Sequence, residues 1–174
     1  MRAVESRYSA EHHMASVNLI FDDEQTAYLR ELSEKMNLDF GEFIPHATLI
    51  NVTEQDIPRL KLAAAALPSL DKLVLDGVNF LPDEAGNCVC VELRVQKTSW
   101  MVEVRRKLLE MLDDIHPGLD IDGFRPHITL GIVEAGTLGD VDMSAIPRQL
   151  PVITKPRAVA CYNGVHGKVV EVVE

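Results

Sequence analysis

The apolar and polar residues of this chain alternate with two different periods. A period of two residues predicts a β-strand, because successive side chains of a strand point to opposite faces. Apolar residues at positions i, i+3 and i+7 predict a helix with one buried face. The predicted strands are residues 14–21, 46–52, 72–81, 88–95, 127–133, 155–162 and 168–173, and the predicted helices are 22–36, 54–67 and 99–115.

The order of these elements repeats along the chain. Each half, at about 14–82 and 87–174, runs strand, helix, strand, connection, strand. This order predicts an α+β, bilobal, duplicated fold, in which two antiparallel β-sheets face a central cleft and the helices lie on the outside. We therefore expect one domain over residues 14–174. Residues 1–13 are polar and are expected to form a poorly ordered lead-in.

One short motif occurs in both halves, at the start of the strand that follows the first helix of each half. Residues 43–49 read FIPHATL and residues 124–130 read FRPHITL, so both copies have the form Phe-x-Pro-His-x-Thr-Leu. The proline favours an extended backbone and cannot donate a hydrogen bond to a neighbouring strand, which suits the first position of a strand. The repeat at matching places argues for a shared role.

The motif places a histidine and a threonine together on one face of each strand. His46 and Thr48 share one face, as do His127 and Thr129, because residues i and i+2 of a strand point the same way. Two imidazoles across one cleft suit paired acid–base catalysis near neutral pH. The hydroxyls can donate hydrogen bonds to phosphate oxygens. Nothing in this set requires a metal or another cofactor, and we expect none.

Two such motifs in a chain of this size resemble those of the 2H phosphoesterase superfamily. This is the group of 2′-5′ RNA ligases and 2′,3′-cyclic phosphodiesterases. The resemblance extends over residues 14–173 and implies a bilobal fold with a central cleft. It also implies metal-independent hydrolysis of a cyclic phosphodiester on an RNA end or a nucleotide.

By this resemblance, His46 and His127 are the general acid and base, with His127 favoured as the base. Thr48 and Thr129 would bind the phosphate. The Arg-Pro before His127 is also similar to the second motif of many members. After the first motif, residues 50–52 read INV, where RNA-ligase-like members often have Phe-Leu-Gly. This departure leaves the subfamily and the substrate open.

Four further residues are candidate substrate contacts. Arg125 can bind a phosphate, and the rings of Phe43, Phe124 and Tyr162 can stack on a base. Each has a structural alternative, because aromatic side chains are often buried in the core. An arginine beside an active strand can equally be a solvated surface residue.

Composition limits the partners and the compartment. The net charge of −10 argues against binding long duplex nucleic acid through phosphate contacts. It allows a nucleotide or an RNA terminus with a cyclic phosphate in a locally basic cleft. No apolar run is long enough to cross a membrane. The cysteines, Cys88, Cys90 and Cys161, are odd in number, and Cys88 and Cys90 lack the spacing of metal ligands. We therefore expect the protein to work in a reducing cytoplasm.

Two other functions remain open. A metal-dependent hydrolase would need acidic ligands near the histidines, and Asp39 and Asp122 are the nearby candidates. Neither stands at a repeated offset from its histidine, which disfavours a shared metal site. A non-catalytic module that binds nucleotides or RNA ends is the other alternative, and the presence of both histidines argues against it.

Overall fold

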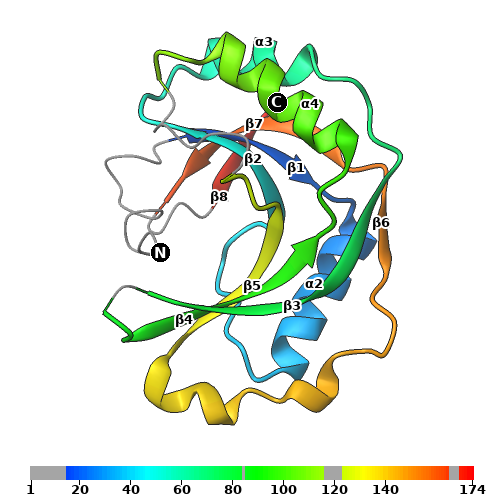
Figure 1. Cartoon of the computed structure of the whole chain (residues 1–174), viewed down its shortest axis with the longest axis vertical. Helices are drawn as coiled ribbons and strands as arrows, with labels where there is room; N and C mark the ends of the chain where they lie inside the picture. The colour runs from blue at the N-terminus through cyan, green and yellow to red at the C-terminus, as the bar shows by residue number, and fades with distance from the viewer. Residues whose placement is uncertain (1–14, 84, 116–122, 165–168) are drawn as a thin grey trace.

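A computed structural model describes residues 15–83, 85–115, 123–164 and 169–174. The lead-in predicted at 1–13 lies outside the described residues. Within them the fold is α+β, as predicted (Figure 1). The strands are β1 (Ala15–Ile20), β2 (His46–Val52), β3 (Lys72–Pro82), β4 (Cys88–Val95), β5 (His127–Glu134), β6 (Val152–Thr154), β7 (Arg157–Asn163) and β8 (Val169–Val173). The helices are α2 (Asp23–Lys35), α3 (Ile57–Ala65) and α4 (Ser99–Met111), with short 3₁₀ helices η1 (Ala135–Asp140) and η2 (Met143–Ala145).

Side-chain caps fix where the helices begin. Asp22 accepts a hydrogen bond from the backbone N–H of Gln25 at 2.8 Å, and Thr98 caps α4 in the same way. Such caps satisfy a backbone donor that has no partner within the helix. The start predicted for α3 is wrong by three residues: Asp56, not Thr53, caps this helix. Pro58 follows in the first turn, where a missing N–H costs nothing.

The strands form one antiparallel sheet of eight, in the order β6-β3-β4-β5-β2-β1-β7-β8. β2 and β5 are joined through a single residue pair, Ala47 opposite Ile128. Two separate sheets were predicted from sequence, but the structure has one sheet, in which two groups of four strands meet at this narrow junction. Figure 1 shows the groups, with β3, β4 and β5 below and β1, β2, β7 and β8 above.

Each group of four strands takes strands from both halves of the sequence. β3, from the first half, pairs with β4 of the second half. β7, from the second half, returns to pair with β1 of the first half, with Ala15 opposite Tyr162. The outer strands continue the pattern, since β6 pairs with β3 and β8 pairs with β7. The first half therefore gives β3 to the group of β4 and β5, and the second half gives β7 and β8 to the group of β1 and β2.

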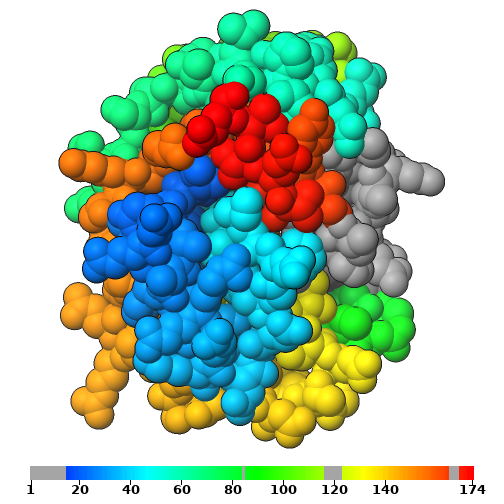
Figure 2. Space-filling model, turned by 180° about the vertical axis from the view of Figure 1, so that it is seen from behind, coloured from blue at the N-terminus to red at the C-terminus, as the bar shows by residue number. Residues whose placement is uncertain are grey.

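The helices bury their apolar faces against the strands that carry the motif and their neighbours. α4 packs on β2, α2 packs on β5, and α3 packs on β1 and β7. Figure 2 shows the opposite face, where α2 and the segment after it form a continuous surface beneath β8. In the part of the chain that the structure describes, no helix is long and apolar enough to span a membrane. The largest fully buried side chains are Leu19, Leu29, Met36, Leu49, Ile50, Leu60, Leu73, Leu93, Met101, Leu108, Leu112 and Ile128.

Candidate active site

The two motif strands each have one buried face and one accessible face. In β2, Ala47 and Leu49 are fully buried, whereas His46 and Thr48 are partly exposed. β5 repeats this pattern, with its histidine and threonine partly exposed and the two apolar residues that follow them buried. The apolar side chains pack into the core, and the histidine and threonine side chains remain accessible to a ligand.

The register of β2 and β5 brings the two halves of the site together. Ala47 lies opposite Ile128 in an antiparallel pair. Continuing that register by one residue on each side matches His46 with Thr129 and Thr48 with His127. Side chains directly opposite on one face have Cβ atoms about 5 Å apart, and diagonal neighbours about 7–8 Å. The two histidines are diagonal neighbours in this register. A phosphate-sized group fits between side chains at that spacing.

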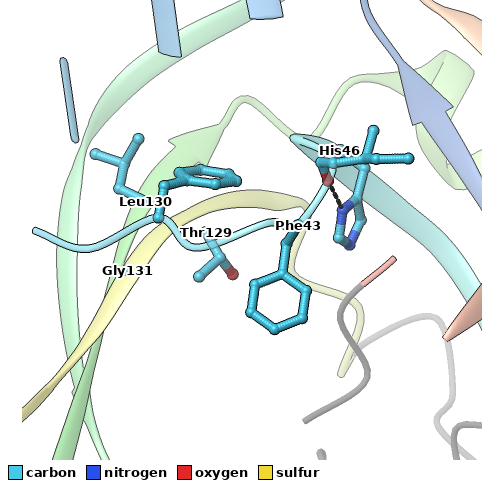
Figure 3. A pocket seen from close by; sticks show the side chains of 7 residues that line it. Phe43, His46, Thr129, Leu130 and Gly131 are labelled. Carbon is cyan, nitrogen blue, oxygen red and sulfur yellow. Dashed lines mark hydrogen bonds between the residues drawn. The ribbon is translucent and has the colours of Figure 1, made fainter. Parts of the chain in front are cut away.

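A pocket beside this junction contains residues from both motifs. It is shallow, with a cavity volume of only about 10 Å³, roughly the room that one water molecule needs. Figure 3 shows His46 and Thr129 on its wall, with the ring of Phe43 beside them. Thr48 and His127 are not among its lining residues. The pocket is lined by Phe40, Phe43, Ile44, His46, Thr129, Leu130 and Gly131.

Both histidines are held by the same backbone contact. Nδ1 of His46 lies 2.7 Å from the carbonyl oxygen of Ile44, and Nδ1 of His127 lies 2.8 Å from that of Arg125. A carbonyl only accepts hydrogen bonds, so each Nδ1 carries a proton and donates it. This fixes the tautomer of the neutral ring and leaves Nε2 as the atom that can take or give a proton.

A buried carboxylate lies behind the second histidine. Glu92, on β4, is 1 % exposed, and its Oε2 lies 3.4 Å from Nε2 of His127. Its Oε1 lies 3.4 Å from Nη2 of Arg125 and 3.5 Å from Nδ2 of Asn79. A buried carboxylate is costly without compensating charge. Sequence reasoning missed this residue, although one acid within the apolar run CVCVELRV of β4 was a signal.

The other predicted contacts fall in different places. Phe43 lines the pocket, and the side chain of Arg125 is 41 % exposed beside Glu92. Phe124 is buried, with the guanidinium carbon of Arg105 5.2 Å from its ring centre. The structure therefore places Phe124 in the core, where it is not available to stack on a base.

Tyr162 is also remote from the pocket. It lies on β7 opposite Ala15, at one end of β1. His46 lies opposite Ile20, at the other end of that strand. Five residues of extended strand therefore separate the two positions, and the structure does not bring Tyr162 to the histidines.

Of the two acids considered as metal ligands, Asp39 accepts a hydrogen bond from the backbone N–H of Gly41 at 2.8 Å. Asp122 lies outside the described residues. Among the residues that are described, no three His, Cys, Asp or Glu side chains are grouped so as to hold a metal ion.

Comparisons with known proteins give distant structural likenesses only. No protein-family model matches the chain, and no curated protein matches its sequence. Usb1 of Kluyveromyces marxianus with uridine monophosphate is similar at 11 % identity and a TM-score of 0.45, over 77 % of each chain. Another Usb1 structure from that organism is similar at 9 % identity and a TM-score of 0.44, over 78 % of each chain. A phosphoesterase crystal structure has 14 % identity and a TM-score of 0.48, over 88 % of this chain and 90 % of the other.

Likenesses this weak carry no argument about activity.

Proposed function

We propose that this protein is a metal-independent phosphoesterase that hydrolyses a cyclic phosphodiester. The substrate would be the 2′,3′-cyclic phosphate of an RNA end or a nucleotide, or a related nucleotide. One observation carries the proposal: His46 and His127 have their Nδ1 atoms tied to carbonyls in the same way. They stand on one face of two paired strands, each opposite a threonine in the register of that pair. This is a symmetric set of two proton carriers and two hydroxyl donors.

The position of Glu92 suggests which histidine is the acid. Nδ1 of His127 donates to a carbonyl, and the carboxylate of Glu92, 3.4 Å from Nε2, is a suitable acceptor for a proton carried by that atom. We therefore assign His127 as the general acid and His46 as the general base. This reverses the preference that the family resemblance gave.

In the proposed reaction, water attacks phosphorus in line with the leaving ribose oxygen. His46 Nε2 takes a proton from the water as the new P–O bond forms. His127 gives its Nε2 proton to the ribose oxygen as the old P–O bond breaks, so the product is a phosphomonoester with a free hydroxyl. A second proton exchange with solvent restores both rings. Acid–base catalysis of this kind contributes roughly 10²–10⁴ to the rate.

The remaining residues would bind the substrate. Thr48 and Thr129 would donate hydrogen bonds to the non-bridging phosphate oxygens, which gain charge in the transition state. Arg125 would add positive charge at the same group. Phe43, on the pocket wall, would contact the base or the ribose.

A substrate panel followed by phosphorus NMR tests the proposal. The panel contains 2′,3′-cyclic nucleotides, RNA with a terminal cyclic phosphate, 2′-5′-linked oligonucleotides and ADP-ribose cyclic phosphate. We expect the cyclic-phosphate resonance of at least one substrate to give way to a monoester resonance, and His46→Ala to prevent this. If nothing is converted, the hydrolase proposal is wrong. Binding without conversion would favour the nucleotide-binding alternative.

A further inference from the structure

Glu92 is an unusual neighbour for a phosphate site, because it places a negative charge where an anion would bind. Its carboxylate is almost fully buried, and the contact of its Oε2 with Nε2 of His127 is long, at 3.4 Å. The contacts of Oε1 with Arg125 and Asn79 are long, at 3.4 and 3.5 Å. Such a group is costly to keep in a fold. A role in substrate selection accounts for its presence.

The fixed charges beside the site cancel. Arg125 contributes one positive charge and Glu92 one negative charge. Arg94, further along β4, is paired with Asp76 at 2.5 Å and adds none. A phosphodiester anion therefore brings one negative charge that these groups do not offset. A phosphate with two negative charges brings a second one, which is more costly in a partly buried place.

We propose that Glu92 makes this site selective for singly charged phosphodiesters and against doubly charged phosphomonoesters. The inference rests on the proposed function, and it identifies the charge state that the site accepts. A cyclic phosphodiester has one negative charge. The second pKa of a phosphomonoester is about 6, so above that pH it has two.

The same selectivity favours release of the product. Hydrolysis converts the bound diester into a monoester, while His127 gives up its proton and its positive charge. The negative charge of Glu92 then faces a product with two negative charges, and fewer positive charges remain nearby to offset them. At an effective dielectric constant of about 20, one extra unit charge within several ångströms of Glu92 changes the dissociation constant roughly ten- to hundredfold.

Two ligands that differ by one charge test this inference. Adenosine 3′-monophosphate and its O-methyl ester share base, ribose and phosphate, and uridine analogues provide a second base. Dissociation constants are measured by calorimetry at pH 8 for the wild-type protein and for Glu92→Gln. Glu103→Gln, which replaces an exposed residue of α4, is the matched control for the loss of one negative charge.

We expect the wild-type protein and Glu103→Gln to bind the methyl ester more tightly than the monoester. Glu92→Gln should reduce this preference by at least about tenfold, mainly by tighter binding of the monoester. A merely structural role for Glu92 would instead weaken both ligands equally, and that result would overturn the inference.

The wild-type protein alone tests the charge selectivity, even if Glu92→Gln does not fold. Equal affinity of the wild-type protein for the monoester and the methyl ester would overturn the inference. In that case the proposed function stands as long as the substrate panel is converted. If neither ligand binds and no panel member is converted, the proposed function fails, and the inference fails with it.

Discussion

At the scale of single residues, each proposed catalytic side chain depends on a carbonyl two positions before it in the chain. Ile44 and Arg125 provide these carbonyls, and each precedes the proline of its motif. The proline fixes its own φ and favours an extended conformation for the residue before it. The motif therefore positions the ring as well as supplying it.

Replacement of either histidine should remove most of the activity. We expect His46→Ala or His127→Ala to lower turnover by about 10²–10⁴, the usual range for acid–base catalysis. The double variant should be little worse than a single one, because the two groups act as a unit. Thr48→Ala and Thr129→Ala should cost less, since each removes one phosphate hydrogen bond.

These variants are compared by steady-state kinetics on the best substrate of the panel. Thr137→Ala, an exposed change on η1, is the control for threonine removal and should keep full activity. Activity near the wild-type level in either single histidine variant would refute the two-histidine mechanism.

Cys161 should make stability depend on alkaline pH. Burial raises the pKa of its thiol from 9.0 to about 11. Between these values the unfolded chain loses the thiol proton while the folded chain keeps it, so the free energy of unfolding falls as pH rises. The loss amounts to at most roughly 2–3 kcal/mol, at about 1.4 kcal/mol per pKa unit.

Urea unfolding of the wild type and Cys161→Ala between pH 8 and 11 measures this effect. The variant should show a shallower decline, whereas Cys88→Ala, at a partly exposed position, should keep the wild-type slope. Parallel curves for the wild type and Cys161→Ala would show that the thiol has the same pKa in the folded and unfolded states.

Single residues also show what a sequence reveals and what it does not. The paired motif was visible because it is local and repeated. The role of Glu92 was not visible in the same way. The single acid in the apolar run of β4 marks it as unusual, but its contact with His127 depends on β4 lying beside β5. Phe124, like Phe43, was a candidate base contact with burial in the core as the alternative. In the structure Phe124 is buried and packs against the buried Arg105. That helix contact breaks the symmetry of the two motifs.

At the scale of elements, periodicity and caps predicted the three α-helices and seven of the eight strands of the described residues, but they missed the short strand β6 and the 3₁₀ helices η1 and η2. The exchange of strands between halves was not predictable in this way. Pairing of β1 with β7, or of β3 with β4, depends on packing between distant segments. The alternation of apolar and polar residues in a strand does not reveal which strand it pairs with. The joining of β2 to β5 at one pair has the same origin, since a single bridge leaves no pattern in the sequence.

The close packing of the segment after α2 against β5 can be tested at Gly131. A Cβ added there would lie 3.0 Å from Cβ of Leu38 and 3.4 Å from the carbonyl oxygen of Asp39. We expect Gly131→Ala to lower the free energy of unfolding by about 1–3 kcal/mol, as overpacking does. Activity should fall as well, because Gly131 lines the pocket.

Chemical denaturation and turnover measure both effects. Gly136→Ala is the control, since nothing lies within 4 Å of a Cβ at that position. Wild-type stability in Gly131→Ala would mean that the segment after α2 moves away easily, and the pocket wall would then be adaptable.

At the scale of the whole molecule, the proposal makes turnover independent of metals. The two histidines, two threonines and Arg125 supply the proton carriers and phosphate ligands that the reaction needs. We therefore expect dialysis against EDTA to leave turnover on the best panel substrate unchanged. Loss of turnover that a divalent ion restores would favour the metal-dependent hydrolase instead. A known metal-dependent phosphodiesterase treated in parallel shows that the chelation was effective.

The exchanged strands also affect how the chain is made. β1 ends at Ile20, yet its partner β7 begins only at Arg157. At about 5–20 residues per second, the ribosome would need on the order of ten seconds or more to deliver that partner. Until then one edge of β1 has unpaired backbone groups, which are prone to pair with other chains. The nascent protein must keep this edge covered while nearly all of the second half is synthesised.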